Sequence, residues 1–179
     1  MSDATSPLFS HSHNLLKVRG CQSLLDVLCF EGQEALSEPF CYTIEFTSPD
    51  KAITPQQMLM QDASLTLQAP VDQGFGIGVQ QPVRTLQGTV TGFERLSTSR
   101  DETRYCLTLQ PRLALLARSH QNRIYQDMSV PDIVEHILRT RHDMRGEDFV
   151  FTLANEYPRR EQVMQYNEDD LTFISRLLA

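Results

Sequence analysis

An alternation of apolar and polar residues from Leu15 to about Leu109 limits the fold more than any other feature of the chain. Tyr42, Ile44 and Phe46 alternate with threonine and glutamate. The same alternation recurs in three further runs: Leu65–Ala69, Leu86–Gly92 and Tyr105–Leu109. Because side chains two residues apart in a strand share a face, each run predicts a short strand with one apolar side. Several such strands between turn residues predict an antiparallel barrel or sandwich.

Three stretches inside this region depart from simple alternation. Leu24–Phe30 is apolar on both faces, which is typical of a strand covered on both sides. Thr54 followed by Pro55 predicts a short helix, because proline fits the first helical position. The run that starts at Gly74, Gly-Phe-Gly-Ile-Gly, lacks both the Gly-x-Gly-x-x-Gly spacing and the apolar helix of a nucleotide-binding loop. We expect a hairpin tip or an insertion at residues 73–80, to which the sequence assigns no role.

Beyond Pro111 the apolar spacing changes to that of helices. One or two helical turns are predicted by a group of leucines: Leu113, Leu115 and Leu116. Ser129 predicts a helix N-cap, with Pro131 in the first turn and Asp132 at the capping-box position. The apolar stripe that follows has helical spacing and consists of Val130, Ile133, Val134, Ile137 and Leu138. His136 falls off this stripe and is expected in solvent.

The last residues of the chain, from Tyr166 onward, predict an amphipathic helix. Asn167 is the expected N-cap, and Glu168–Asp170 place negative charge in the first turn, where the helix dipole favours it. The expected apolar face consists of Leu171, Ile174, Leu177 and Leu178. No glycine or proline stop follows. We therefore expect much of the partner surface beyond Ala179 and interpret the chain as the front part of a longer protein.

Two further runs, Asp148–Leu153 and Glu161–Tyr166, alternate and predict strands. The whole pattern predicts a mainly β (α+β) fold, in which an antiparallel barrel or sandwich is followed by the start of an α/β module. The expected division is a flexible N-terminal tail (1–14), the all-β module (15–118) and an incomplete α/β module (119–179). His11 and His13 in the tail have no third ligand nearby, so a metal site there is not expected.

Composition and charge exclude several classes of protein. No apolar run approaches the roughly 18 residues of a membrane helix, and the N-terminus lacks the features of a signal peptide, so we expect synthesis in the cytoplasm. The net charge of −7 is uneven, because residues 95–145 are net basic and use only arginine. Interleaved acidic residues and sparse aromatics argue against nucleic-acid binding and favour arginines in subunit contacts or solvent.

No cysteine pair has Cys-x-x-Cys spacing, and small buried thiols are expected at Cys21, Cys29, Cys41 and Cys106.

No constellation typical of an enzyme is present in the sequence. The hydrolase elbow, the Walker loop, the His-Glu-x-x-His motif and the EF-hand loop are all missing. Glu168 and Asp170 have the chemistry of an acid/base pair, but capping and dipole interactions at a helix start already account for both. The sequence therefore predicts no catalytic, cofactor-binding or metal-binding residue, no cofactor and no enzyme activity.

A set of motifs runs in fixed order through residues 24–179. They are F-x-G-x-E-x-L-S-x-P-F-x-Y (30–42), R-x-x-x-G-x-V (84–90), Y-x-L-x-L-x-P-x-L (105–113), N-x-I-Y-Q (122–126), S-V-x-D-I (129–133) and Q-Y-x-E-x-D-L-x-F-I-x-R-L-L (165–178). In order and spacing they resemble VgrG-type spike (tip) proteins of the type VI secretion system, and the last motif is the most specific. The resemblance covers the N-terminal, phage-baseplate-hub-like region of that family.

The resemblance implies a structural role in protein secretion and virulence. In this family the region supplies a β-barrel of the phage baseplate hub type and the start of an α/β element. The family implies a homotrimer in the full-length protein, docking on an Hcp-type tube protein, contacts with baseplate proteins and delivery of effectors during cell puncturing. It also implies secretion by the type VI system into a target cell or the medium. We expect the 179-residue chain alone to be a monomer or a weak oligomer.

Three alternatives remain at the level of sequence. The first is the hub of a contractile phage tail or phage-like particle, which residues downstream of Ala179 would distinguish. The second is the front part of an effector enzyme whose catalytic domain lies beyond residue 179. The third is a nucleic-acid-binding β-barrel, which a lack of DNA binding at every salt concentration would exclude.

The apolar face of the final helix leads to a test of stability. Replacing Ile174 or Leu177 by aspartate is expected to lower the free energy of unfolding by about 3 kcal/mol or more, because a buried unpaired charge is costly. Thermal melting of each variant checks this. An unchanged melting temperature would place the helix in solvent.

Overall fold

The computed structural model describes residues 14–72, 78–146 and 148–179. The chain divides into two compact units, Met1–Pro111 and Arg112–Ala179. Each unit has a hydrophobic core of its own, so each is described by itself. The predictions for His11 and His13 lie outside the described residues.

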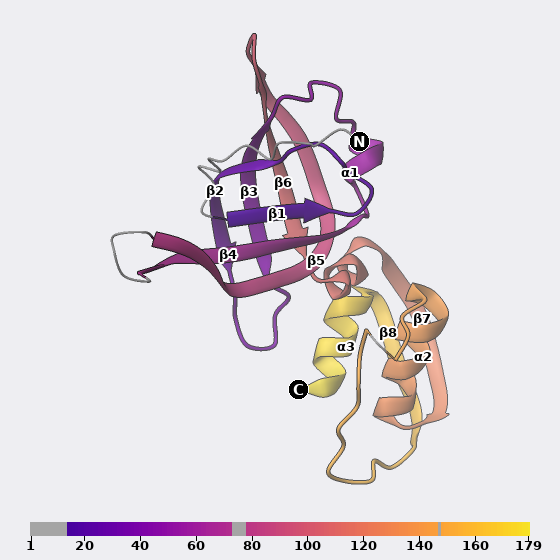
Figure 1. Cartoon of the computed structure of the whole chain (residues 1–179). Coiled ribbons are helices and arrows are strands. Elements are labelled where there is room, and N and C mark those ends of the chain that lie inside the picture. The colour runs from indigo at the N-terminus through magenta and orange to yellow at the C-terminus, as the bar shows by residue number, and fades with distance from the viewer. Residues whose placement is uncertain (1–13, 73–77, 147) are drawn as a thin grey trace, which may run out of the picture. The chain divides into compact units, whose positions relative to one another are not determined.

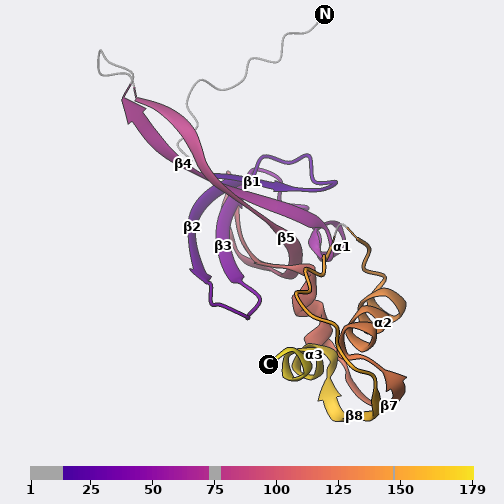
Figure 2. The same ribbon diagram turned by 90° about the horizontal axis from the view of Figure 1, so that it is seen from below.

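The first unit is a closed antiparallel barrel (Figures 1 and 2) with the strand order β1-β2-β3-β6-β5-β4 among the described residues. Its elements are β1 (Asn14–Val18), β2 (Asp26–Gln33), β3 (Cys41–Ser48), α1 (Pro55–Met58), β4 (Asp62–Asp72), β5 (Gly78–Thr98) and β6 (Thr103–Gln110). This confirms the predicted mainly β fold with an antiparallel barrel. The predicted short helix is also confirmed, because Thr54 caps α1 and Pro55 opens it.

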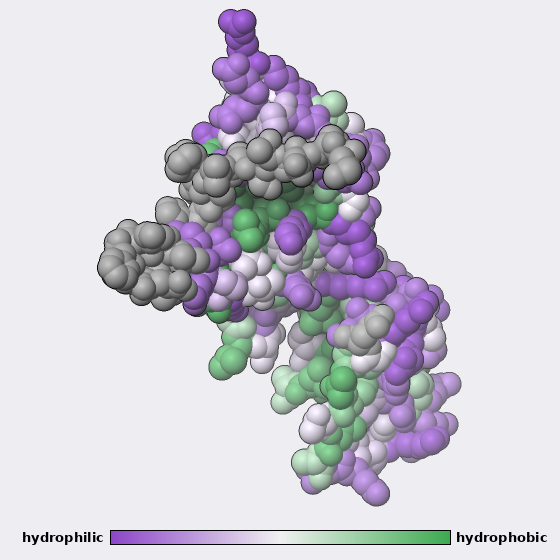
Figure 3. Space-filling view, viewed as in Figure 1, coloured by the Kyte–Doolittle hydropathy of each residue, from purple (hydrophilic) through white to green (hydrophobic). Residues whose placement is uncertain are grey.

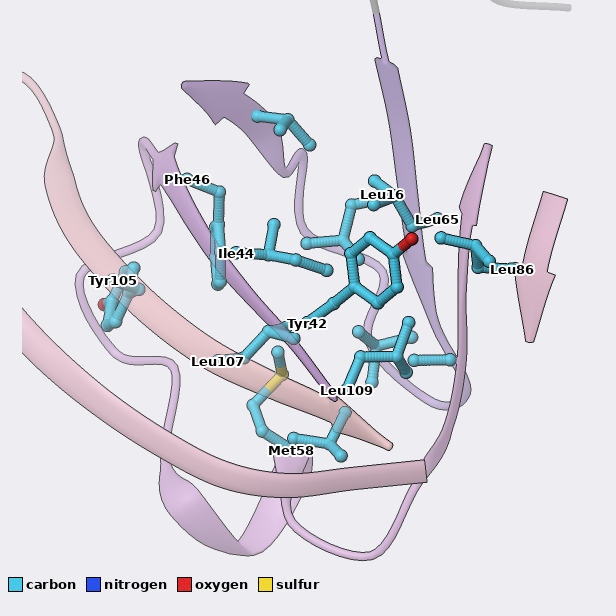
Figure 4. Packing of buried hydrophobic residues seen from close by; sticks show 14 of the residues in the cluster. Leu16, Tyr42, Ile44, Phe46, Met58, Leu65, Leu86, Tyr105, Leu107 and Leu109 are labelled. Atoms are coloured by element: carbon cyan, nitrogen blue, oxygen red, sulfur yellow. The ribbon is translucent and has the colours of Figure 1, made fainter. Parts of the chain in front are cut away.

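The barrel core follows directly from the alternation of apolar residues. Tyr42, Ile44 and Phe46 of β3 are all buried. They lie opposite three buried residues of β6 in the antiparallel register: Leu109, Leu107 and Tyr105, respectively. Figure 4 shows these side chains gathered with others of the same core. The aromatic rings of Phe46 and Tyr105 stack with centroids 5.5 Å apart, so β3 and β6 are joined by packing as well as by the strand ladder.

Most of Leu24–Phe30 belongs to a strand, but the prediction that this strand is covered on both sides is wrong. β2 begins at Asp26, and Leu28 and Phe30 are 50% and 38% exposed. A barrel strand has one face inside and one outside, and a β-bulge between Val27 and Cys29 shifts the register of β2 against β3. Cys29 is consequently exposed, which contradicts the expected buried thiol, whereas Cys106 of β6 is buried as expected.

β4 and β5 continue beyond the barrel as a two-stranded ribbon (Figure 2). β1 follows β4 only as far as Leu67, whereas β5 pairs with β4 as far as Asp72 opposite Gly78. The two strands are consecutive and antiparallel, which agrees with the predicted hairpin. Most of the predicted tip, residues 73–77, lies outside the described residues.

The second unit packs helices on a two-stranded antiparallel sheet, β7–β8 (Figure 1). Its elements are η1 (Arg112–Arg118, a 3-10 helix), β7 (His120–Met128), α2 (Val130–His142), β8 (Arg160–Asp169) and α3 (Asp170–Leu178). Ser129 caps α2 as predicted, because its side chain accepts a hydrogen bond from the Asp132 backbone N–H. The five predicted stripe residues of α2 are all buried, and His136 is exposed as expected.

For the second unit, the predicted strand Glu161–Tyr166 is confirmed as part of β8, one predicted strand is wrong and one strand was not predicted. Asp148–Leu153 is not a strand, because no strand pairs with it. Phe149 and Phe151 instead contact each other edge to face and pack against the core. β7 had no strand prediction of its own, because few of its residues are apolar.

The final helix also differs from its prediction. Asp169 rather than Asn167 is the N-cap and accepts from the Thr172 backbone N–H, while Asn167 still belongs to β8. The buried face of α3 includes Phe173 and Ile174, whereas Leu178 is exposed. Phe173 and Ile174 pack into the core of the second unit, against which Leu171 and Leu177 are partly buried.

The close approach of β5 to β6 generates a test at Gly88. A Cβ atom at this position would lie 2.5 Å from the carbonyl oxygen of Gln110, which belongs to the backbone and cannot rotate away. We expect Gly88→Ala to lower the free energy of unfolding by about 2 kcal/mol, through overpacking. Urea unfolding measures this, with Gly146→Ala as the control because no atom lies within 4 Å of the new Cβ there. Equal stability of the two variants would contradict the prediction.

Candidate functional site

The two carboxylates that the sequence offered as an acid/base pair, Glu168 and Asp170, have separate partners in the structure. Asp170 is 0% exposed, and its Oδ1 accepts from Arg141 Nη1 at 2.7 Å. Its Oδ2 lies 2.7 Å from His142 Nε2. Glu168 instead forms a surface ion pair with Arg176, at 2.5 Å. The two acids therefore do not form a joint site.

Three elements together position the polar groups around Asp170. Arg141 and His142 end α2, Gln165 points inward from β8, and Asp170 opens α3. Gln165 Nε2 donates to Asp170 Oδ1 at 2.8 Å and also to the backbone oxygen of Glu168. A buried carboxylate is costly unless it is paired and hydrogen-bonded. These donors therefore offset the cost of removing the Asp170 carboxylate from water.

The geometry around Asp170 is suited to holding the unit together and not to chemistry. Both carboxylate oxygens already have donors, and the side chain has no exposed surface for a substrate. Asp170 also lies in the first turn of α3, where the helix dipole favours a negative charge. The sequence indicates the dipole contribution but not the buried network, because the distant donors Arg141 and His142 leave no local motif.

A second polar cluster ties the β2–β3 connection to β5 in the barrel. Glu34 Oε1 accepts from Tyr42 Oη at 2.9 Å and from Arg84 Nη2 at 2.6 Å. The hydrogen bond from Arg84 is the main cause of a lowered pKa of the Glu34 carboxyl. Burial, followed by the contact with Glu34, raises the pKa of Tyr42.

Four of the nine arginines in the basic segment form ion pairs with carboxylates. Those paired with carboxylates are Arg104 with Glu45, Arg112 with Asp148, Arg139 with Glu135 and Arg141 with Asp170. Arg95 lies over the ring of Tyr105. Within the described ranges, Arg123 and Arg145 have no ion-pair partner. The segment therefore mixes arginines that are paired with carboxylates and arginines that are not.

The described residues contain no group of three or more His, Cys, Asp or Glu side chains placed to hold a metal ion. Among these same residues, no helix has the length and apolar character needed to cross a membrane. The Gly-rich run 74–78 does not have the spacing of a nucleotide-binding loop, and it lies mainly outside the described ranges.

Exposed apolar side chains mark candidate assembly surfaces on each unit. On the first unit they lie on β2 and on the connection that follows it: Leu28, Phe30 and Leu36. On the second unit one such group lies on the outer face of the β7–β8 sheet: Ile124, Met164 and Tyr166. Figure 3 shows green apolar surface over α3 and over the β2–β3 connection, and mainly purple surface over α2 and β7. Exposed apolar groups of this kind are typical of protein contacts.

Residues 33–179 match the protein family described as the phage tail baseplate hub (GPD). A solved structure that is 58% identical in sequence superposes with a TM-score of 0.78 and covers 92% of this chain and 42% of its own. It is the Escherichia coli c3393 protein, described as a component of the type VI secretion system with structural similarity to the T4 bacteriophage tail proteins gp27 and gp5.

Curated relatives show the same similarity. The type VI secretion system spike protein VgrG4b of Pseudomonas aeruginosa is 34% identical over 95% of this chain and 19% of its own length. VgrG3 of Vibrio cholerae is 35% identical over 92% of this chain and 16% of its own. Another V. cholerae relative, named actin cross-linking toxin VgrG1, is 31% identical over 92% of this chain and 15% of its own. The chain thus spans less than a fifth of these relatives.

The Asp170 network generates a prediction of stability. We expect Asp170→Asn to lower the free energy of unfolding by about 3 kcal/mol, because Arg141 is left without its anion in a largely buried position. Glu135→Gln, which breaks only the exposed pair with Arg139, is the matched control and is expected to cost about 0.5 kcal/mol or less. Urea unfolding of both variants checks this, and equal losses would contradict the structural role of Asp170.

The Glu34 cluster generates a prediction of pH dependence. A carboxyl whose pKa is lowered by folding contributes stability above its unfolded pKa and loses it as the pH falls through the folded value. The stability advantage of the wild type over Glu34→Gln is therefore expected to be largest near neutral pH and to shrink below the ordinary value of 4.5. Melting temperatures measured from neutral to acid pH check this. An advantage that stays constant with pH would contradict it.

Proposed function

The chain belongs to the phage tail baseplate hub family, and on that premise we propose that it is a structural part of a type VI secretion spike. The observation that carries the proposal is the solved structure of the c3393 protein, which shares the fold at 58% identity and is described as a component of this system. The spike homologues among the curated relatives support the same role. In this role the chain forms the N-terminal, hub-like portion of a longer spike protein.

The proposed role is mechanical, and the barrel suits it. A closed barrel pairs its strands around the ring and leaves few free edges, so it resists deformation and unwanted pairing. Its apolar core is continuous through the paired faces of β3 and β6. A load-transmitting part needs such rigidity and needs no nucleophile or cofactor.

The partners follow from this role and are part of the proposal. We infer that three copies of the full-length protein assemble, dock on an Hcp-type tube protein and contact baseplate proteins, with effectors carried on the spike. The exposed apolar side chains on β2 and on the β7–β8 sheet supply surface for such contacts. The assembled spike would be secreted into a target cell or the medium after synthesis in the cytoplasm. The proposed domain plan is a tail (1–14), a barrel (15–118) and an α/β module (119–179), although the structure groups Arg112–Arg118 with the second unit.

We propose no catalytic role for the described residues. The buried Asp170 is saturated by donors, and the remaining carboxylates of the final helix serve as a cap and an ion pair. The relative named actin cross-linking toxin matches this chain over 15% of its own length, so an enzymatic part in such a protein is compatible with a structural role here. The second candidate, a hub of a contractile phage tail, draws support from the similarity of c3393 to gp27 and gp5.

A chimera tests the proposed function. This chain replaces the matching region of the E. coli c3393 protein, and the chimera is expressed in a strain that lacks its own c3393 protein. Release of the tube protein into the medium, detected by immunoblotting, is the expected outcome. A chimera with Ile174→Asp in the buried face of α3 is the control and should not restore release. A stably expressed wild-type chimera that releases no tube protein would contradict the proposal.

A further inference from the structure

A pocket of about 510 Å³ lies between β7 and α2 in the second unit. The side chains that matter for its chemistry are Arg123, Tyr125, Met128, His136, Thr140 and Arg141. Its lining includes no aspartate or glutamate. Basic and apolar groups thus share one concave surface on a chain whose formal net charge is −7.

The strand and helix periods place these groups opposite each other. Arg123 and Tyr125 are alternate residues of β7, so both face the side on which Tyr125 is buried. His136 and Thr140 are one turn apart on α2 and share a face of that helix. The rings of Tyr125 and His136 meet edge to face with centroids 6.2 Å apart. This contact joins β7 to α2 at the bottom of the pocket.

Arg141 and Arg123 differ in how their charge is balanced. The guanidinium of Arg141 is held by Asp170 and also contacts the Tyr125 hydroxyl, so it is immobile and its charge is compensated. Arg123 is exposed and has no ion-pair partner in the part of the chain that the structure describes. The arginines of the pocket therefore leave one uncompensated positive charge, which Arg123 carries.

We propose that this pocket receives the carboxylate of a glutamate or aspartate side chain from a partner polypeptide. Arg123 donates to the carboxylate, because a planar guanidinium matches the two oxygens of that group. Tyr125 and Met128 supply apolar wall for the methylene groups of the inserted side chain. The binding site thus accepts an acidic residue on an otherwise apolar segment.

Charge arguments favour a protein over a nucleic acid as the partner. One uncompensated positive charge balances one carboxylate, whereas nucleic-acid binding of useful strength neutralises several phosphates. The net charge of −7 also repels a polyanion at long range. This inference goes beyond the proposed assembly role, and its test uses the 179-residue chain alone. A negative result for the pocket therefore does not contradict the assembly role, and a negative result for the assembly role does not contradict the pocket.

The test is a titration of the ¹⁵N-labelled chain, followed by amide and guanidinium chemical shifts. The probe is the capped peptide acetyl-Ala-Leu-Glu-Leu-Ala-amide, and its matched control carries glutamine in place of glutamate. We expect the acidic peptide to shift resonances of Arg123, Tyr125 and Thr140 with a Kd of about 1 mM. The glutamine peptide should bind about tenfold more weakly, because the charge-assisted hydrogen bonds are lost.

Two variants of equal charge separate a specific pocket from general attraction. Arg123→Gln removes the uncompensated charge from the pocket and should weaken binding of the acidic peptide about tenfold. Arg145→Gln removes an unpaired arginine that does not line the pocket and should leave binding unchanged. Both positions are exposed, so both variants should keep the wild-type fold, which their spectra report directly.

Several outcomes would overturn the inference. Equal affinity for the two peptides would remove the role of the carboxylate, and equal loss in the two variants would reduce binding to net charge. Shifts that lie outside the pocket, or no shifts with the acidic peptide, would also refute it. Tighter binding of inorganic phosphate or of an oligothymidylate at the same residues would replace the proposed partner by a phosphate ligand.

Discussion

Burial of the Asp170 carboxylate is the constraint on which the second unit depends. A charge with no exposure is tolerated only when donors surround it, and here they come from the end of α2 and from β8. The network is complete only when α2, β8 and α3 are all in place, so it ties their packing to one another. The same bond to Asp170 also holds Arg141 at the wall of the pocket between β7 and α2. One buried charge therefore organises both the core and a surface feature of this unit.

The barrel of the first unit is stabilised in a different way. Its interior is almost wholly apolar, and the facing residues of β3 and β6 supply its largest buried side chains. Polar interactions such as the Glu34 cluster lie at its margin, where they connect the β2–β3 connection to β5. A closed, apolar barrel with exposed leucine and phenylalanine on β2 fits a part that packs against other subunits. This combination is consistent with assembly as the main task of the chain.

The alternation in β3, β4 and β6 is sufficient to predict an antiparallel barrel or sandwich, because a period of two leaves each strand with one face to bury, and the family resemblance selects the barrel. The Ser129 cap and the apolar stripe of α2 were equally clear, since their spacing is local. The prediction failed where the partner decides the structure. Leu28 lies at the bulge of β2 and is half exposed, and Asp148–Leu153 alternates without a strand to pair with. β7 is mostly polar and has no apolar alternation that would predict a strand; it is a strand because it pairs with β8. The motifs of residues 30–178 identified the family where no catalytic constellation did.

The sequence by itself determined the class of fold, the main helix and the absence of a recognisable catalytic motif, because periodicity, capping and motif spacing are local properties. Tertiary structure alone decided the role of Asp170. In the chain this residue is one of three consecutive acids at a helix start, and its neighbours Glu168 and Asp169 became a surface ion pair and the helix cap. Only Asp170 points into the core, toward donors that lie 5 to 29 residues away along the chain. Which of three equivalent charges is buried depends on where distant elements meet, and that information is not present in local sequence.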